Sequence, residues 1–73
     1  MTQQKLMADQ LENESKQDYL KFLVFVGMGS NRSLNKAYRQ FYETTSEVSQ
    51  AWRTLADKYR WTERASEYDK RSA

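Results

Sequence analysis

The residues best suited to chemistry in this sequence are small hydroxyls, one amide and one arginine between positions 45 and 53. A glutamine pairs bidentately with adenine, an arginine does so with guanine, and short hydroxyl side chains allow close approach to base edges. The same residue types also cap helices and cover solvated faces, so both interpretations stay open. The residues predicted to contact DNA bases are Thr45, Ser46, Ser49, Gln50 and Arg53.

A second group of candidates consists of cations. Arg32, Lys36 and Arg39 are spaced by four and three residues, which places them on one face of a helix. Three cations on one face suit a phosphate backbone, although such a stripe is as often a solvated surface. Two later arginines join them as candidates. The residues predicted to contact phosphates are Arg32, Lys36, Arg39, Arg60 and Arg64.

Aromatic residues are interleaved with the cations near the end of the sequence. Trp61, Ala65 and Tyr68 keep helical spacing, which favours a core face with the neighbouring cations paired to acids. Stacking on nucleic-acid bases is the alternative, and Arg64 and Tyr68, four residues apart, are spaced to form a stacked pair.

The composition excludes several classes of chemistry. Cysteine and histidine are both absent from the 73 residues, which excludes disulfides, Cys/His zinc sites, thiol nucleophiles and Ser-His-Asp triads. Glu63, Glu67 and Asp69 are close in sequence, but no partner group indicates a catalytic pocket. We therefore predict no enzyme activity, no cofactor and no metal site.

The charge is unevenly distributed along the chain. The net charge is +2. Residues 1–31 carry three lysines and four acids, a net of −1, whereas residues 32–73 carry nine basic and six acidic groups, a net of +3. All six arginines lie in the second half. The net charge alone indicates no partner, but the excess of positive charge lies in the half of the chain that contains the residues predicted to contact double-stranded DNA.

Nothing in the sequence predicts a membrane segment. The longest uninterrupted apolar run is residues 22–26, far below the ~18 residues of a membrane-spanning helix. The first residues also lack the apolar block of a signal peptide. We expect an intracellular, cytoplasmic protein without a membrane partner.

The first predicted helix covers residues 16–27. Ser15 and Asp18 resemble a capping box before an apolar run. Residues 19–28 also have the composition of a strand, but no second strand-like run is present to pair with it. The glycines and asparagine of residues 27–31 are typical of a helix C-terminus.

Two further helices are predicted in the middle of the chain. One covers residues 33–41, with Ser33 as its N-cap. The next begins at Thr44, where Glu47 completes a capping box, and ends near residue 59. Only two or three residues then separate the two helices, which is typical of a helix-turn-helix.

A fourth short helix is predicted at about residues 62–70. The predicted fold class is an all-α, three- to four-helix bundle that contains a helix-turn-helix. Residues 1–14 are expected to form a flexible or weakly helical N-terminal arm, and residues 15–73 the helix-turn-helix domain. The predicted core consists of Leu20, Leu23, Val24, Leu34, Ala37, Tyr38, Phe41, Val48, Trp52, Leu55, Tyr59, Trp61 and Tyr68.

Two motifs together resemble a family of phage- and mobile-element-encoded proteins. The motifs are Gly29-x-x-Arg32-Ser33-Leu34 and Tyr59-Arg60-Trp61-Thr62-Glu63-Arg64-Ala65 with Tyr68-Asp69, separated by a polar turn that leads into Ser46, within a resemblance over residues 19–69. The family includes small helix-turn-helix proteins and the DNA-binding domains of phage terminase small subunits. The resemblance implies a helix-turn-helix fold and DNA binding, with any ATPase or nuclease in a separate large subunit. The sequence departs from the family at residues 42–45, where a glycine is usual, and at Leu55, where a tryptophan is common.

We therefore predict a non-catalytic duplex-DNA-binding helix-turn-helix protein of a phage or mobile element, terminase small-subunit-like or regulatory. Because its charge is modest, a homo-oligomer or a larger assembly would help binding. The alternative is a small helical protein-interaction module, an adaptor or inhibitor without DNA binding. It is favoured by the nearly all-round apolarity of residues 16–27, where Phe22, Phe25 and Val26 are expected outside the inner face.

Overall fold

A computed structural model describes residues 10–72 of the chain. The predicted all-α fold is confirmed, since no strand occurs in this part of the chain and residues 19–28 belong mainly to a helix. The elements are α1 (Lys16–Gly27), the 3-10 turn η1 (Gly29–Asn31), α2 (Leu34–Tyr42), α3 (Gln50–Lys58) and α4 (Trp61–Ser72).

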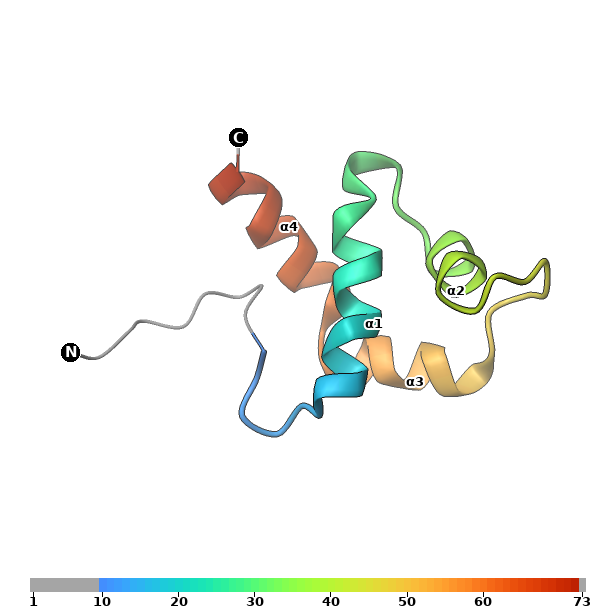
Figure 1. Ribbon diagram of the computed structural model, residues 1–73. Coiled ribbons are helices and arrows are strands. Elements are labelled where there is room, and N and C mark those ends of the chain that lie inside the picture. The colour runs from blue at the N-terminus through green and yellow to red at the C-terminus, as the bar shows by residue number, and fades with distance from the viewer. Residues whose placement is uncertain (1–9, 73) are drawn as a thin grey trace.

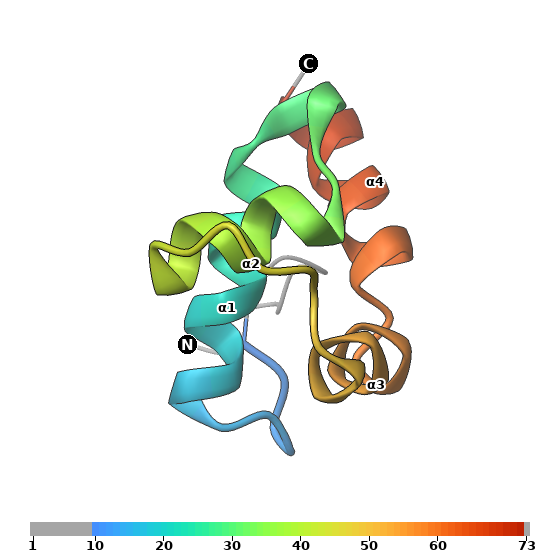
Figure 2. The ribbon, with the colours of Figure 1, turned by 90° about the vertical axis from the view of Figure 1, so that its right-hand side faces the viewer.

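Helix α1 lies at the centre of the domain. Helices α2 and α4 pack on either side of it, and α3 packs against both α2 and α4 (Figure 1). Helices α2 and α3 cross steeply. Figure 1 shows α2 nearly end on and α3 along its length, whereas Figure 2 shows the reverse. Helices that cross in this way are typical of a helix-turn-helix.

Serine side chains cap the first three helices. Each hydroxyl accepts a hydrogen bond from the backbone amide three residues later, which satisfies one of the free amides of a helix N-terminus. The pairs are Ser15 with Asp18 (3.1 Å), Ser33 with Lys36 (3.1 Å) and Ser49 with Trp52 (3.3 Å). The predicted caps at Ser15 and Ser33 are therefore confirmed.

The predicted start of the third helix is wrong. Helix α3 begins at Gln50, and Thr44 is not its cap. The Thr44 hydroxyl instead accepts a hydrogen bond from the Ser46 amide at 3.2 Å, a local turn that competes with helix formation. Residues 43–49 thus form a loop, longer than the 3–4 residues of a standard helix-turn-helix and longer than the predicted two or three.

Contacts with α2 hold this loop in place. The Val48 amide donates to the Asn35 side-chain oxygen at 2.8 Å, and the Val48 side chain is buried. Arg39 Nε donates to the Ser46 carbonyl at 3.1 Å. These contacts fix the chain in a non-helical path up to Ser49, so the helix starts later than its local sequence predicts.

The core is built around Trp61, which is fully buried. Its ring centroid lies 5.9 Å from that of Phe22, 5.6 Å from that of Phe25 and 5.4 Å from that of Trp52. Large rings compensate for a small domain, because each buries much apolar area. The buried apolar residues are Phe22, Phe25, Val26, Ala37, Val48, Trp52, Tyr59, Trp61 and Ala65.

The predicted inner face of α1 is wrong. Leu20 and Leu23 are 40% and 38% exposed, whereas Phe22, Phe25 and Val26 face the core. The two phenylalanines bring their rings onto Trp61, a contact that the smaller leucines cannot match. Outside α1, the prediction also fails for Tyr68, which is 41% exposed. The remaining predicted core residues are fully or partly buried; they are Val24, Leu34, Ala37, Tyr38, Phe41, Val48, Trp52, Leu55, Tyr59 and Trp61.

The expected N-terminal arm falls into two parts. Residues 1–9 lie outside the described residues. Glu14, in contrast, is 3% exposed and packs inside the domain, and the Tyr59 hydroxyl donates to the Asn13 carbonyl at 3.2 Å. The packed domain thus includes residues N-terminal to Ser15.

The helices are short. Helices α1 and α4 have 12 residues each, compared with about 20 in a typical transmembrane helix. Within residues 10–72, none of the helices combines the length and apolarity required to span a bilayer.

Candidate nucleic-acid interface

The exposed side of α3 carries two of the predicted base-contacting residues. Trp52 and Tyr59 are buried, and they fix the rotation of α3 about its axis. The other side exposes Gln50, Arg53 and Thr54. Residues three and four apart are neighbours on a helix, so these three side chains form one polar surface, which we call the α3 face.

The other predicted base-contacting residues precede α3. The Ser49 hydroxyl is occupied as the N-cap of the helix. Thr45 and Ser46 are exposed but lie in the loop, where the Ser46 carbonyl accepts from Arg39. Their predicted place on the helix is therefore wrong, and they are not part of the α3 face.

Thr54 is not among the residues that the sequence predicts to contact DNA bases. A helix that starts near Thr44 places its first turns, which are the turns that enter the groove, before Thr54. The spacing of Trp52 and Tyr59 indicates which side of the helix is buried. The opposite side contains Gln50 and Thr54, four residues apart, so this spacing could have identified Thr54.

The predicted stripe of cations keeps two members on α2. Lys36 is exposed, and its Nζ donates to the Asn31 carbonyl at 3.3 Å. The Arg39 side chain is 40% exposed, and its Nη2 lies 3.9 Å from the Glu47 carboxylate, which is 80% exposed. Such exposed pairs contribute little. The Lys36 ammonium and the terminal nitrogens of Arg39 therefore remain accessible to a phosphate, while Arg39 Nε stays bonded to the Ser46 carbonyl.

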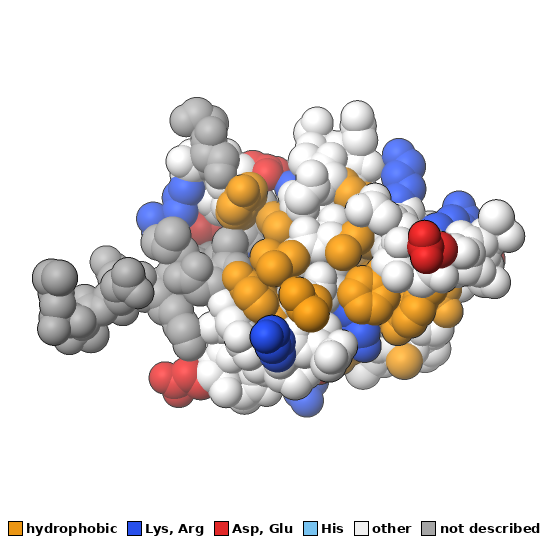
Figure 3. Space-filling model, in the orientation of Figure 1, with side chains coloured by type: hydrophobic (Ala, Val, Ile, Leu, Met, Phe, Trp, Pro, Cys, Tyr) orange, Lys and Arg blue, Asp and Glu red, His pale blue; other side chains and the backbone are white. Residues whose placement is uncertain are grey.

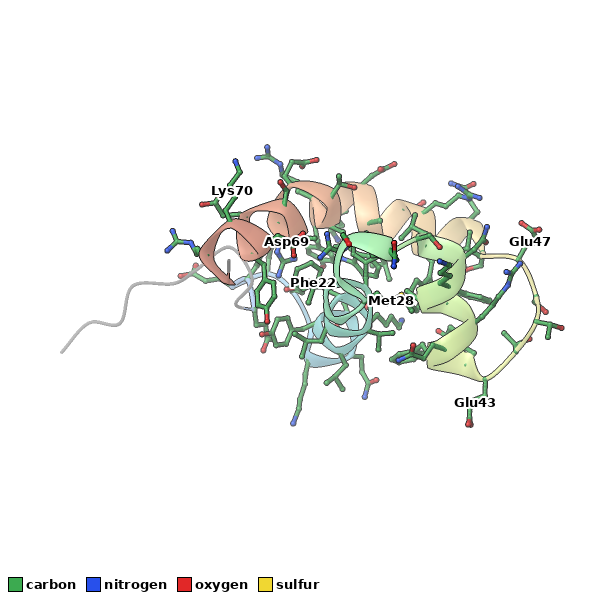
Figure 4. All side chains as sticks on the ribbon, turned by 90° about the horizontal axis from the view of Figure 1, so that it is seen from above. Phe22, Met28, Glu43, Glu47, Asp69 and Lys70 are labelled. Carbon is green, nitrogen blue, oxygen red and sulfur yellow. The ribbon has the colours of Figure 1, made fainter. Side chains whose placement is uncertain are left out.

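Arg32, the third member, is occupied within the fold. Its two terminal nitrogens each donate to Asp69 on α4 at 2.8 Å, and Nη2 also donates to the Val26 carbonyl at 3.3 Å. Figure 4 shows Asp69 on the side of α4 that faces the other helices. A bidentate pair of this kind is geometrically specific. Its role is therefore to hold the start of α2 against α4, in contrast to the predicted phosphate contact.

The Arg32–Asp69 pair changes the titration of the carboxyl group. Hydrogen bonds from the Arg32 guanidinium hold the pKa of Asp69 below its ordinary value. A carboxyl whose pKa is lower in the folded state stabilises the fold fully at pH values above its unfolded pKa of about 4. That stabilisation is lost as the pH falls through the lower, folded-state pKa.

We expect Asp69→Asn to lower the urea midpoint of unfolding at pH 7. The gap between the variant and the wild type should then narrow from about pH 4 downward and close when Asp69 is protonated. Glu63→Gln, which removes a more exposed ion pair with Arg60, is the control for a general loss of charge. A gap that stays constant down to about pH 2 would contradict the contribution assigned to this pair.

The two later arginines have opposite environments. Arg60 is exposed, and its pair with Glu63 (2.9 Å) has both side chains more than half exposed, so a phosphate can compete for it. Arg64 is 1% exposed. It forms two hydrogen bonds with the Glu14 carboxylate, at 3.0 and 3.1 Å, and its guanidinium lies 3.9 Å from the Phe22 ring centroid. The predicted phosphate contact of Arg64 is therefore wrong.

The acidic residues form no recognisable centre in the described part of the chain. Residues 10–72 contain no group of three or more acidic side chains that could hold a metal ion. A cleft is lined by Phe25, Leu34 and Thr62 together with Arg32 and Asp69. Arg32 and Asp69 form an ion pair with each other, so the cleft does not indicate a catalytic site.

Comparisons with known proteins give no match. No protein-family model, curated protein or solved structure matches the chain. The resemblance to phage and mobile-element helix-turn-helix proteins therefore depends on the sequence motifs and stays a prediction.

Proposed function

We propose that the protein binds duplex DNA without catalysis and that the α3 face reads the major groove. A helix fits in this groove, where glutamine and arginine recognise adenine and guanine through paired hydrogen bonds. Gln50 and Arg53 are the residues for these contacts. Thr54 adds a hydroxyl and a methyl group, and the methyl group of thymine is a natural partner for the latter.

The observation that carries the proposal is the state of Arg53. Within residues 10–72, five of the six arginines have a carboxylate partner, and Arg53 has none. An exposed arginine that the fold does not use is available for an external acceptor. The five pairs are Arg32–Asp69, Arg39–Glu47, Arg60–Glu63, Arg64–Glu14 and Arg71–Glu67.

The exposed cations near α3 are the candidates for contacts with DNA phosphates. In a helix-turn-helix the first helix crosses the DNA backbone while the second enters the groove, which assigns Lys36 and Arg39 to phosphates, with Arg60 following α3. Proteins with strongly salt-dependent binding make about six or more phosphate contacts. One copy of this chain is therefore expected to bind weakly, and a second copy on the same DNA would strengthen binding.

The family resemblance supports the proposal through the scaffold. Arg32 of the first motif bonds to Asp69 of the second motif, and Trp61, Arg64 and Ala65 of the second motif are buried. The motif residues thus have structural roles in the domain that presents α3. On this basis we propose a phage or mobile-element protein, terminase small-subunit-like or regulatory.

Arg53→Ala is the variant that tests the α3 face. Random duplex DNA provides the first probe, and repeated selection from that pool gives the preferred sequence. On that sequence we expect Arg53→Ala to weaken binding by about 1–3 kcal/mol and to relax the preference at one base pair. Arg71→Ala is the matched control, because Arg71 is exposed on α4 and paired with Glu67. Fluorescence anisotropy measures both.

The outcomes separate the function from the face. Binding to random duplex that falls steeply between low and physiological salt supports DNA binding. No binding at low salt overturns it. If Arg53→Ala and Arg71→Ala weaken DNA binding equally, the protein still binds DNA, but the α3 face is not the surface that reads the bases.

A second candidate function is a protein-interaction module. It is favoured by the apolar side chains that gather over α1 and continue toward α2 in Figure 3, since exposed apolar patches mark interaction surfaces. Four large apolar side chains are exposed on the domain. They are Leu20 (40%), Leu23 (38%), Tyr42 (48%) and Tyr68 (41%). This function predicts that random duplex DNA does not bind at any salt concentration.

A further inference from the structure

Helix α1 exposes an apolar stripe along the side opposite its buried aromatic residues. Leu20, Leu23 and Gly27 are exposed on this side, and Lys16 is exposed at its N-terminal end. These four residues, which we call the α1 stripe, recur at spacings of three and four and therefore lie along one line of the helix. In Figure 3, apolar side chains gather over α1 and continue toward α2.

The α1 stripe is self-complementary. The pair Leu20 and Leu23 and the pair Lys16 and Gly27 share one midpoint, between positions 21 and 22. When two copies of α1 lie antiparallel about a two-fold axis at that midpoint, Leu20 of each copy faces Leu23 of the other. A two-fold interface requires this reciprocity, in which each residue meets the partner's counterpart.

The ends of α1 are also complementary to each other. The last turn of α1 has no basic side chain, and on its exposed side Gly27 has no side chain. Apart from the adjacent residues and the backbone of α1 itself, no atom lies within 4 Å of the position that a Cβ would take, so another helix can approach closely. An antiparallel copy places its Lys16 beside this end, where the carbonyl end of the helix favours a cation.

We propose that the protein forms a homodimer through antiparallel packing of the two α1 stripes. Stable interfaces bury about 1,200–2,000 Å², more than one pair of 12-residue helices supplies, so we expect dissociation in the micromolar range. The stripe contains no residue of α3. The dimer is thus independent of the proposed DNA contacts, although it would supply a second copy, which strengthens binding to the same DNA.

Sedimentation of the full chain over a range of concentrations tests the dimer. We expect the protein to form detectable dimer at concentrations below about 500 µM. Leu23→Glu should raise the dimer dissociation constant at least about tenfold, because it places a charge in the contact. Ala51→Glu is the matched control, because Ala51 is exposed on α3 and gains the same charge. Circular dichroism verifies that both variants are folded.

Cross-linking tests the orientation. The chain has no cysteine, so Leu20→Cys and Leu23→Cys each introduce a single thiol. With a short bis-maleimide, an equimolar mixture of the two variants should form dimers faster than either variant alone, because position 20 faces position 23 of the other copy. Leu20→Cys mixed with Ala51→Cys is the control.

Three results would overturn the proposal. The first is a monomer up to about 500 µM, which leaves the stripe as a surface for a different protein. The second is a dimer that Leu23→Glu does not weaken. The third is equal cross-linking in the mixture and in the separate variants. None of these results bears on DNA binding by the α3 face.

Discussion

Replacing Arg64 with alanine is expected to destabilise the fold by about 3–5 kcal/mol. Arg64 and Glu14 are 1% and 0% exposed in their side chains, and each is the charge partner of the other. Removal of the arginine leaves a buried carboxylate without its counter-charge, a state that costs several kcal/mol. It also removes the cation that packs on the Phe22 ring and the donor to the Tyr59 carbonyl.

This loss is close to the whole stability of a small domain. A core of this size rarely supplies more than about 3–5 kcal/mol, so Arg64→Ala should be largely unfolded at 25 °C. Urea titration followed by circular dichroism measures the change. Arg60→Ala is the matched control, because it removes an exposed arginine from the same region and should cost less than about 1 kcal/mol.

The double variant Glu14→Leu with Arg64→Met distinguishes loss of the charges from loss of one partner. Apolar residues of similar volume often replace a buried ion pair without loss of stability. The double variant is therefore expected to be more stable than Arg64→Ala. A cost for Arg64→Ala near that of Arg60→Ala would show that Glu14 is not buried beneath α4.

The sequence predicted the starts of the two helices that have a single plausible local cap. The hydroxyls of Ser15 and Ser33 each accept a hydrogen bond from the amide three residues later, and α1 and α2 begin directly after these serines. Helix α3 has two locally plausible starts, at Thr44 and at Ser49. A contact 13 residues apart in the chain, from the Val48 amide to Asn35, favours the later start. Local patterns do not contain that information.

The arginines also show that local sequence patterns do not reveal contacts between distant residues. Gln50 and Arg53 were predicted as surface residues and are exposed, because the aromatic spacing of α3 fixes which side is buried. Arg32 and Arg64 were predicted to contact phosphates, but they bond to acids 37 and 50 residues away. Nothing in the spacing of one helix shows which distant acid the fold will bring to it.

The rotation of α1 was beyond prediction for a different reason. Apolar residues occur nearly all round this helix, so its periodicity does not select a face. The choice is made by the fit of Phe22 and Phe25 against Trp61. The leucines left on the other side, Leu20 and Leu23, are the ones that form the α1 stripe.

Replacing Trp61 with alanine is expected to cost about 3–5 kcal/mol, and it should unfold much of the protein. Trp61 is fully buried, and its ring contacts those of Phe22, Phe25 and Trp52. Alanine leaves a cavity at the point where α1, α3 and α4 meet. Near-UV circular dichroism, which reports packed aromatic rings, should be lost together with the cooperative urea transition.

Phenylalanine at the same position separates packing from hydrogen bonding. Within residues 10–72 the indole nitrogen of Trp61 is buried with no hydrogen-bond partner, whereas that of Trp52 donates to the Tyr42 hydroxyl at 3.3 Å. Both Trp→Phe changes lose ring area, but Trp61→Phe also removes a buried N–H that lacks a partner, which costs about 1–3 kcal/mol when present. We therefore expect Trp61→Phe to cost less than Trp52→Phe by about 1–2 kcal/mol in the free energy of unfolding. The reverse order would mean that the Trp61 indole nitrogen has an acceptor in solution.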